Sequence, residues 1–212
     1  MLKPYVAEFI GTFSLSIVVF MSIVAKSAVP TPLLAGIVLA LFVYTIGHIS
    51  GAHLNPAVTI GLWSIKKINW AQGIFYIIAQ FAGAAVAILL ARYYGVAQLT
   101  GAPNNLPVAI AEAIGAFMFA FGIASVVYGR VSAPMTGVVI GGSLAVGATL
   151  AGAYDIGGFL NPAVAFTSGA FNLAFILGPI VGSVIGFQAY KYLSEYDYTP
   201  KKTIEVIEVI VD

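Results

Sequence analysis

The sequence contains no cysteine and very few charged residues. Only 8% of its 212 residues are charged and 60% are hydrophobic, whereas an average soluble domain is about 25% charged. The absence of cysteine excludes disulfides, thiolate catalysis and cysteine-ligated metal sites. A formal net charge of +1 gives no indication of a nucleic-acid partner. This composition predicts a protein whose main solvent is lipid.

The apolar segments also lack the strict alternation of a membrane β-barrel, whose strands are about 10 residues long. Six of them are instead close to the ~20 residues that a helix needs to cross the hydrocarbon of a bilayer. The first follows Lys3, but it contains Glu8 and is longer than the ~7–15 residue core of a cleaved signal peptide, so we expect it to be retained. The six predicted transmembrane helices are residues 5–25, 33–49, 70–92, 108–128, 135–153 and 172–193.

Two further apolar segments, residues 55–64 and 161–170, are too short to cross a bilayer. Each follows a glycine-containing stretch and opens with Asn-Pro-Ala. Asn is favoured at a helix N-cap and Pro at the first helical position, so both segments are predicted to be re-entrant half-helices. The two Asn-Pro-Ala boxes are Asn55, Pro56, Ala57, Asn161, Pro162 and Ala163.

The two halves of the chain repeat each other. Residues 7–13 match residues 111–117 at Ala, Glu, Ile, Gly and Phe, and residues 54–58 are identical to 160–164. Each half has three predicted transmembrane helices, an odd number, so the halves enter the membrane from opposite sides. The fold class is therefore an all-α membrane protein with an inverted repeat. We expect the repeats at residues 1–104 and 105–193, followed by a cytoplasmic tail at 194–212.

The basic residues predict an orientation. With the N-terminus in the cytoplasm, only Lys26 and Arg92 of the nine Lys and Arg residues lie outside, as the positive-inside rule favours. We expect a multi-pass protein of the cell membrane with both termini cytoplasmic. The basic residues then on the cytoplasmic side are Lys3, Lys66, Lys67, Arg130, Lys191, Lys201 and Lys202.

Glycines recur every fourth residue at Gly178, Gly182 and Gly186. Small residues at this spacing allow close approach of membrane helices. We expect this face to pack tightly on another helix, and we expect the same of Gly83, Gly115 and Gly141.

Several motifs together resemble the aquaporin, or major intrinsic protein, family. They are the paired Asn-Pro-Ala boxes, the Ala-Glu-x-x-Gly-x-Phe repeats, the Gly-His-Ile-Ser-Gly-Ala-His-Leu segment before the first box, and Ala-Gln-Phe-Ala-Gly-Ala at residues 79–84. The resemblance covers nearly the whole chain. It implies two half-helices that meet end to end, one pore per subunit and a homotetramer in membrane lipid. It also implies a passive channel for water and small uncharged solutes, with no enzymatic activity and no cofactor.

A single Asn such as Asn55 can be an N-cap and nothing more, but the pair Asn55 and Asn161 predicts a further role. Buried amides need hydrogen-bond partners, and their N–H groups can point into a pore once their oxygens cap the half-helices. We therefore predict that both are the central donors of the pore. The two half-helix N-termini add roughly half an elementary charge each, which in aquaporin-type pores helps to exclude protons and cations.

Glu8 and Glu112 are carboxylates inside predicted transmembrane helices, where charge is costly. Repeat symmetry places each one behind the half-helix loop of its own repeat. There it can accept backbone N–H bonds from irregular backbone at membrane depth, and we favour this structural role. The alternative is a proton relay in a secondary transporter. That interpretation needs an ion- or substrate-coordinating cluster, and the sequence offers only these two symmetric residues.

The chain departs from the family at the outer constriction of the pore. Val164 follows the second Asn-Pro-Ala, where the family usually has Arg. By the resemblance the constriction consists of Ala35, Thr149, Gly158 and Val164. Ala148 takes the place of Thr149 if the loop before Asn161 is one residue short. These small side chains imply a wide, apolar, aquaglyceroporin-like constriction that passes glycerol. The resemblance also implies pore-lining backbone at Ser50, Gly51, Ala52, His53, Gly157, Gly158, Phe159 and Leu160.

Two further alternatives to a conducting channel have to be considered. An intramembrane enzyme needs a nucleophile with a base, or a metal set, and His48 and His53 without supporting carboxylates do not predict a metal site. A non-conducting structural homologue is also an alternative, because a fold does not guarantee a function.

Overall fold

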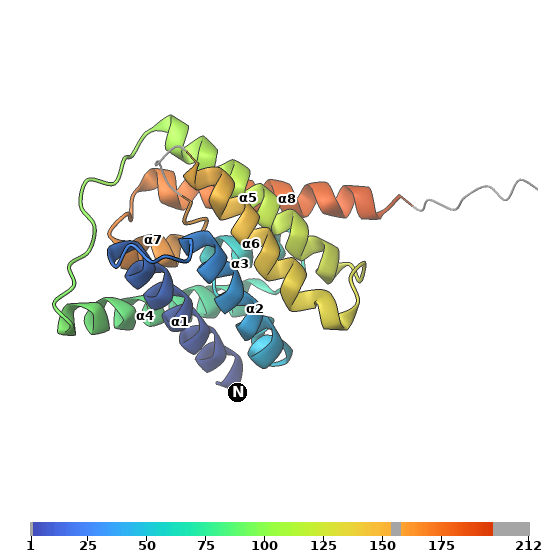
Figure 1. The fold of residues 1–212 in the computed structure, drawn as a ribbon. Helices are drawn as coiled ribbons and strands as arrows, with labels where there is room; N and C mark the ends of the chain where they lie inside the picture. The colour runs from blue at the N-terminus through green and yellow to red at the C-terminus, as the bar shows by residue number, and fades with distance from the viewer. Residues whose placement is uncertain (1, 154–157, 197–212) are drawn as a thin grey trace, which may run out of the picture.

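A computed structural model describes residues 2–153 and 158–196 of the chain, and every regular element in those ranges is a helix (Figure 1). Six of the helices are long and apolar enough to cross a membrane. In chain order the elements are α1 (Lys3–Val24), α2 (Thr31–Ser50), α3 (Pro56–Ser64), α4 (Trp70–Tyr93), α5 (Leu106–Val127), η1 (Ala133–Met135), α6 (Thr136–Gly152), α7 (Pro162–Ser168) and α8 (Leu173–Ser194).

The predicted fold class is confirmed. The six transmembrane helices and the two half-helices, α3 and α7, begin and end within two residues of the predicted positions. Helix α6 is preceded by a single 3₁₀ turn, η1. Helix α7 is shorter than expected because Gly169 takes a left-handed conformation, with φ of +89°, and its N–H closes the helix on Ala165.

The helices pack as two similar groups that exchange their half-helices. Within the first group α1 contacts α2 and α4, and within the second α5 contacts α6 and α8, while α2 and α6 join the groups. Half-helix α3 packs mainly on α8, and α7 packs on α1 and α4. Each half-helix is therefore held largely by the other half of the molecule. The repeat boundary near residue 104 remains a proposal, and residues 197–212 of the predicted tail lie outside the described residues.

Glycine permits the closest helix crossings. Gly178, Gly182 and Gly186 lie against the backbone of α5, and a Cβ atom at Gly178 would lie 2.6 Å from the carbonyl oxygen of Ala109. The predicted packing face on α8 is thus confirmed. The other glycines expected to pack closely also do so, with Gly83 against α1, Gly115 against α6 and Gly141 against α2.

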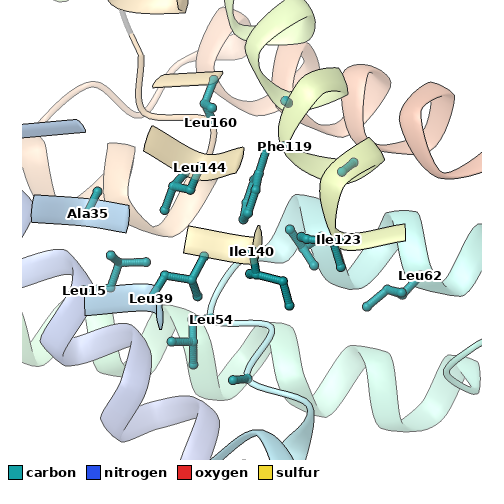
Figure 2. Packing of buried hydrophobic residues seen from close by; sticks show 14 of the residues in the cluster. Leu15, Ala35, Leu39, Leu54, Leu62, Phe119, Ile123, Ile140, Leu144 and Leu160 are labelled. Carbon is teal, nitrogen blue, oxygen red and sulfur yellow. The ribbon is translucent and has the colours of Figure 1, made fainter. Parts of the chain in front are cut away.

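The largest cluster of buried apolar residues surrounds a hollow interior rather than filling it. Figure 2 shows members of this cluster approaching one another from α1, α2, α5 and α6. Several of them also line one or both of two cavities. Among these lining residues are Leu15, Ala35, Leu39, Leu62, Phe119, Ile123, Ile140 and Leu144.

Candidate functional site

The half-helices begin at the two Asn residues, each in an extended conformation that ends the preceding loop. The Asn55 Oδ1 atom accepts a hydrogen bond of 2.8 Å from the N–H of Ala57, and Asn161 Oδ1 accepts one of 3.0 Å from Ala163. The next residue in each chain segment is proline, which has no N–H to satisfy at the first helical position. Both side-chain oxygens are thereby occupied as N-caps.

The side-chain amides of the two Asn residues connect the two halves. Asn55 Nδ2 donates to the carbonyl oxygen of Leu160 at 2.9 Å, and Asn161 Nδ2 donates to that of Leu54, also at 2.9 Å. An Asn amide carries two N–H donors, so one donor on each side chain remains after this reciprocal pairing. Both residues line the same cavity. The arrangement leaves one N–H per Asn available to a molecule in this cavity.

The loops before the half-helices are held by the buried carboxylates. Glu112 accepts the backbone N–H groups of Gly158, Phe159 and Leu160, the last at 2.7 Å. Glu8 accepts those of His53 at 2.9 Å and Leu54 at 2.7 Å. Both carboxylates are fully buried. Three or more donors compensate a charged group that would otherwise be costly at this depth.

The glycine of each Ala-Glu-x-x-Gly repeat also contacts the loop before the half-helix. Leu54 and Leu160 adopt left-handed φ values of +50° and +54° and are completely buried. Each side chain lies over the glycine one turn after the glutamate, and a Cβ atom at Gly115 would lie 2.6 Å from Leu160 Cδ2. Gly11 makes the same room for Leu54. The glutamate therefore holds the backbone of the loop through its N–H groups, and the glycine makes room for the leucine side chain of the same loop.

Within the described residues, a polar network that has no counterpart in the second repeat reaches the two cavities through His53. Gln80 Nε2 donates to Glu8 at 2.8 Å and to Thr59 Oγ1 at 3.0 Å, and the Thr59 hydroxyl donates to the Asn55 carbonyl oxygen at 3.0 Å. His53 Nδ1 lies 3.1 Å from Thr59 Oγ1. Since the single hydroxyl proton is used, Nδ1 donates and Nε2 is left as an acceptor. His53 lines both cavities.

The first cavity, which we call the outer cavity after the predicted orientation, has a volume of about 400 Å³. It holds every residue expected at the constriction, and both alternatives for the uncertain position, Thr149 and Ala148, line it. The Thr149 hydroxyl donates within its own helix to Ala145 at 2.7 Å, and Ala148 is buried. The remaining expected residues in the lining are Ala35, Gly158 and Val164.

The second or inner cavity has a volume of about 530 Å³ and lies at the end where α5 stops and η1 begins. Gly51, Ala52 and His53 line it, whereas Gly158 and Phe159 line the outer cavity. Ser50 and Leu160, which were also expected to line the pore with their backbone, are not among the residues that line either cavity. Their carbonyl oxygens accept hydrogen bonds from the Tyr76 hydroxyl and from Asn55 Nδ2 instead. Gly157 lies outside the described residues.

Two features of the site had no signal in the sequence motifs. The reciprocal Asn bonds join residues more than 100 positions apart, and no local pattern specifies them. Lys67 lines the inner cavity, although its place in the sequence predicts only a role in orientation. Among the described residues, no group of three or more His, Asp, Glu or Cys side chains forms a metal-binding cluster.

The sequence and the fold of this chain are similar to those of known proteins. The profile of the family described as Major intrinsic protein matches residues 1–190. Aquaporin AqpM of Methanothermobacter thermautotrophicus is 31% identical, with 91% of this chain and 97% of that protein covered. Nodulin-26 of Glycine max is 32% identical, over 96% of this chain and 81% of its own length. The fold is similar to the aquaglyceroporin from Plasmodium falciparum, with a TM-score of 0.74, 23% identity, and coverage of 92% of this chain and 98% of that chain.

Proposed function

The chain belongs to the major intrinsic protein family of membrane channels, which are not enzymes, and from this we propose that it passes water and small neutral solutes such as glycerol without energy input. Within that proposal Asn55 and Asn161 supply the central donors, and Ala35, Gly158 and Val164, with Thr149 or Ala148, form the outer constriction. We also propose the family's homotetramer and a location in the cell membrane, with both termini in the cytoplasm.

The observation that carries the proposed solute range is the lining of the outer cavity. The side chains at Ala35, Ala148 and Val164 are small and apolar, and Gly158 has none. Pore diameter and lining decide selectivity in such channels. A lining without a large or charged side chain at these positions offers room and no fixed charge. Solutes larger than water and without charge are the class that this favours.

The remaining amide donors of the two Asn residues support exclusion of protons. A water molecule between them accepts N–H bonds from both, so its own protons point away along the pore in both directions. Such an orientation interrupts a continuous chain of water hydrogen bonds. The positive ends of α3 and α7 meet at the same point, and they disfavour cations there.

The structure of the carboxylate sites argues against a proton-coupled transporter. The two oxygens of Glu8 accept from the Ser50 hydroxyl, two backbone N–H groups and Gln80. Protonation would turn one oxygen into a donor that faces another donor. The hydrogen bonds that Glu112 accepts from the described residues all come from backbone N–H groups, so the same holds there. Neither group lines either cavity.

Reconstituted vesicles in a stopped-flow osmotic assay test the proposal. We expect water and glycerol to enter well above the rate of protein-free vesicles. Val164→Arg should reduce glycerol entry strongly and water entry less, because a guanidinium would narrow the outer constriction and add a positive charge. Val164→Met, which adds bulk without charge, separates the two effects.

Three results would contradict the proposal. Glycerol entry indistinguishable from that of empty vesicles, with normal water entry, would leave a water-only channel. Unchanged glycerol entry in Val164→Arg would mean that Val164 does not lie at the constriction. Saturable flux that depends on a proton gradient would instead favour the transporter.

A further inference from the structure

The two cavities differ in their charge. No Lys, Arg, Asp or Glu lines the outer cavity among the residues that the structure describes, and a single one, Lys67, lines the inner cavity. The inner lining also carries uncharged polar side chains, including those of Tyr44 and Thr136. The fixed charge expected from the family's Arg at the outer constriction is thus missing, and one positive side chain stands at the opposite end.

The backbone around Lys67 is held in a tight turn. Lys66 takes a left-handed conformation with φ of +61°, and the N–H of Lys67 donates to the carbonyl oxygen of Leu62 at 2.9 Å. This turn follows the last residue of α3, so the position of Lys67 is tied to the half-helix that starts at Asn55. The neighbouring Lys66 has the same charge but does not line either cavity.

The side chain of Lys67 is held from the opposite wall. Its ammonium lies 4.9 Å from the ring centroid of Tyr128, the residue that caps α5. A cation over an aromatic face at this distance is attracted to it. The Tyr128 ring in turn packs on Tyr190 of α8, with centroids 5.8 Å apart. The contact links the end of α3 to the end of α5 beside the inner cavity, while the Lys67 side chain stays exposed to water.

We propose that Lys67 is a selectivity residue of this channel, whose positive charge repels cations at the inner mouth and substitutes for the charge missing at Val164. This inference rests on the proposed function. Charged side chains at a pore mouth set ion selectivity, and a cleft with low-dielectric walls focuses their field. A neutral solute has no net charge for this field to act on, so water and polyol flux should not depend on Lys67.

The effect must scale with charge if it is electrostatic. Lys67→Met removes one unit and should raise K⁺ leak through the protein by roughly two- to tenfold, the range expected for a unit charge a few ångströms away in a watery setting. Lys67→Glu changes the charge by two units. The ratio of its K⁺ leak to that of the wild type should therefore be about the square of the ratio for Lys67→Met. Lys67→Arg keeps the charge and should keep the exclusion. Lys66→Met is the matched control and should leave the leak unchanged.

The experiment measures K⁺ leak and water entry in the same vesicles, for the wild type and these four variants, at low salt and at 1 M salt. At 1 M salt the Debye length is about 3 Å, so the differences should shrink. Equal leak in the wild type and Lys67→Glu, with normal water entry, would overturn the inference. A rise of the K⁺ leak in Lys66→Met equal to that in Lys67→Met would also overturn it, because the effect would then come from general surface charge. Absence of water and glycerol entry from every sample would instead overturn the proposed function.

Discussion

Glu8 and Glu112 occupy equivalent positions in the repeats but do not have equivalent partners. Glu8 receives Gln80 Nε2 in addition to backbone and Ser50 donors, and the Oε1 atom of Gln80 has no hydrogen-bond partner among the described residues. Among the residues that the structure describes, Glu112 receives only backbone N–H groups. A side-chain amide can rotate to exchange its donor and acceptor, whereas a backbone N–H cannot. The two glutamates should therefore respond differently to the same substitution.

We expect Glu112→Gln to lower stability more than Glu8→Gln does, by about 1–3 kcal/mol, the cost of one further unsatisfied buried polar group. The new amide at position 8 can donate to the free Oε1 of a rotated Gln80. The one at position 112 faces only backbone donors in the part of the chain that the structure describes. Thermal unfolding of the purified variants in one detergent measures the difference.

The second substitution Gln80→Leu supplies the control. In the Glu8→Gln background it removes the compensating acceptor, so the advantage of position 8 should disappear. Equal melting temperatures of Glu8→Gln and Glu112→Gln, with Gln80 intact, would show that the amide of Gln80 does not reorient.

At the scale of helices, most of the fold could be predicted from the sequence because its signals are local. Apolar length marks the six transmembrane helices, and Asn-Pro marks the start of both half-helices, so the boundaries agree within two residues. The contacts of the half-helices could not be predicted in this way. The exchange of α3 and α7 between the two halves, and the acceptors of Asn55 and Asn161, depend on residues about a hundred positions away.

Glycine packing is the element-scale feature that is simplest to test. A Cβ atom at Gly182 would lie 2.7 Å from the carbonyl carbon of Ala113, in the backbone of α5, which has little room to move. We expect Gly182→Ala to lower stability by about 1–3 kcal/mol through overpacking. Gly142 lies in α6, and apart from the adjoining backbone of that helix no atom lies within 4 Å of the position that a Cβ atom would take there. Gly142→Ala should therefore be neutral or stabilising, by about 0.5–1 kcal/mol. Thermal unfolding of both variants checks the contrast, and a similar loss in the two would contradict it.

For the whole molecule, the absence of cysteine makes orientation directly measurable. Leu2 and Tyr94 are 75% and 67% exposed and lie at the starting end of α1 and the final end of α4, which are opposite ends of the bundle. With an impermeant maleimide on intact cells, we expect Tyr94→Cys to be labelled and Leu2→Cys to react only after the membrane is opened. The unaltered chain has no thiol and gives the background. Labelling in the reverse order would invert the predicted orientation and exchange the outer and inner ends of the pore.

The reciprocal hydrogen bonds of the two Asn residues also determine when during synthesis the centre of the molecule can form. Asn55 is separated from its acceptor Leu160 by 105 residues. At the usual 5–20 residues per second of a ribosome, about 5–20 s pass between the appearance of the first and that of the second. During that interval the nascent first half has an amide donor at its centre and no acceptor from the second half. The hydrogen bonds at the centre of the molecule therefore form late. Until then, the first half resides in the membrane insertion machinery without the second half.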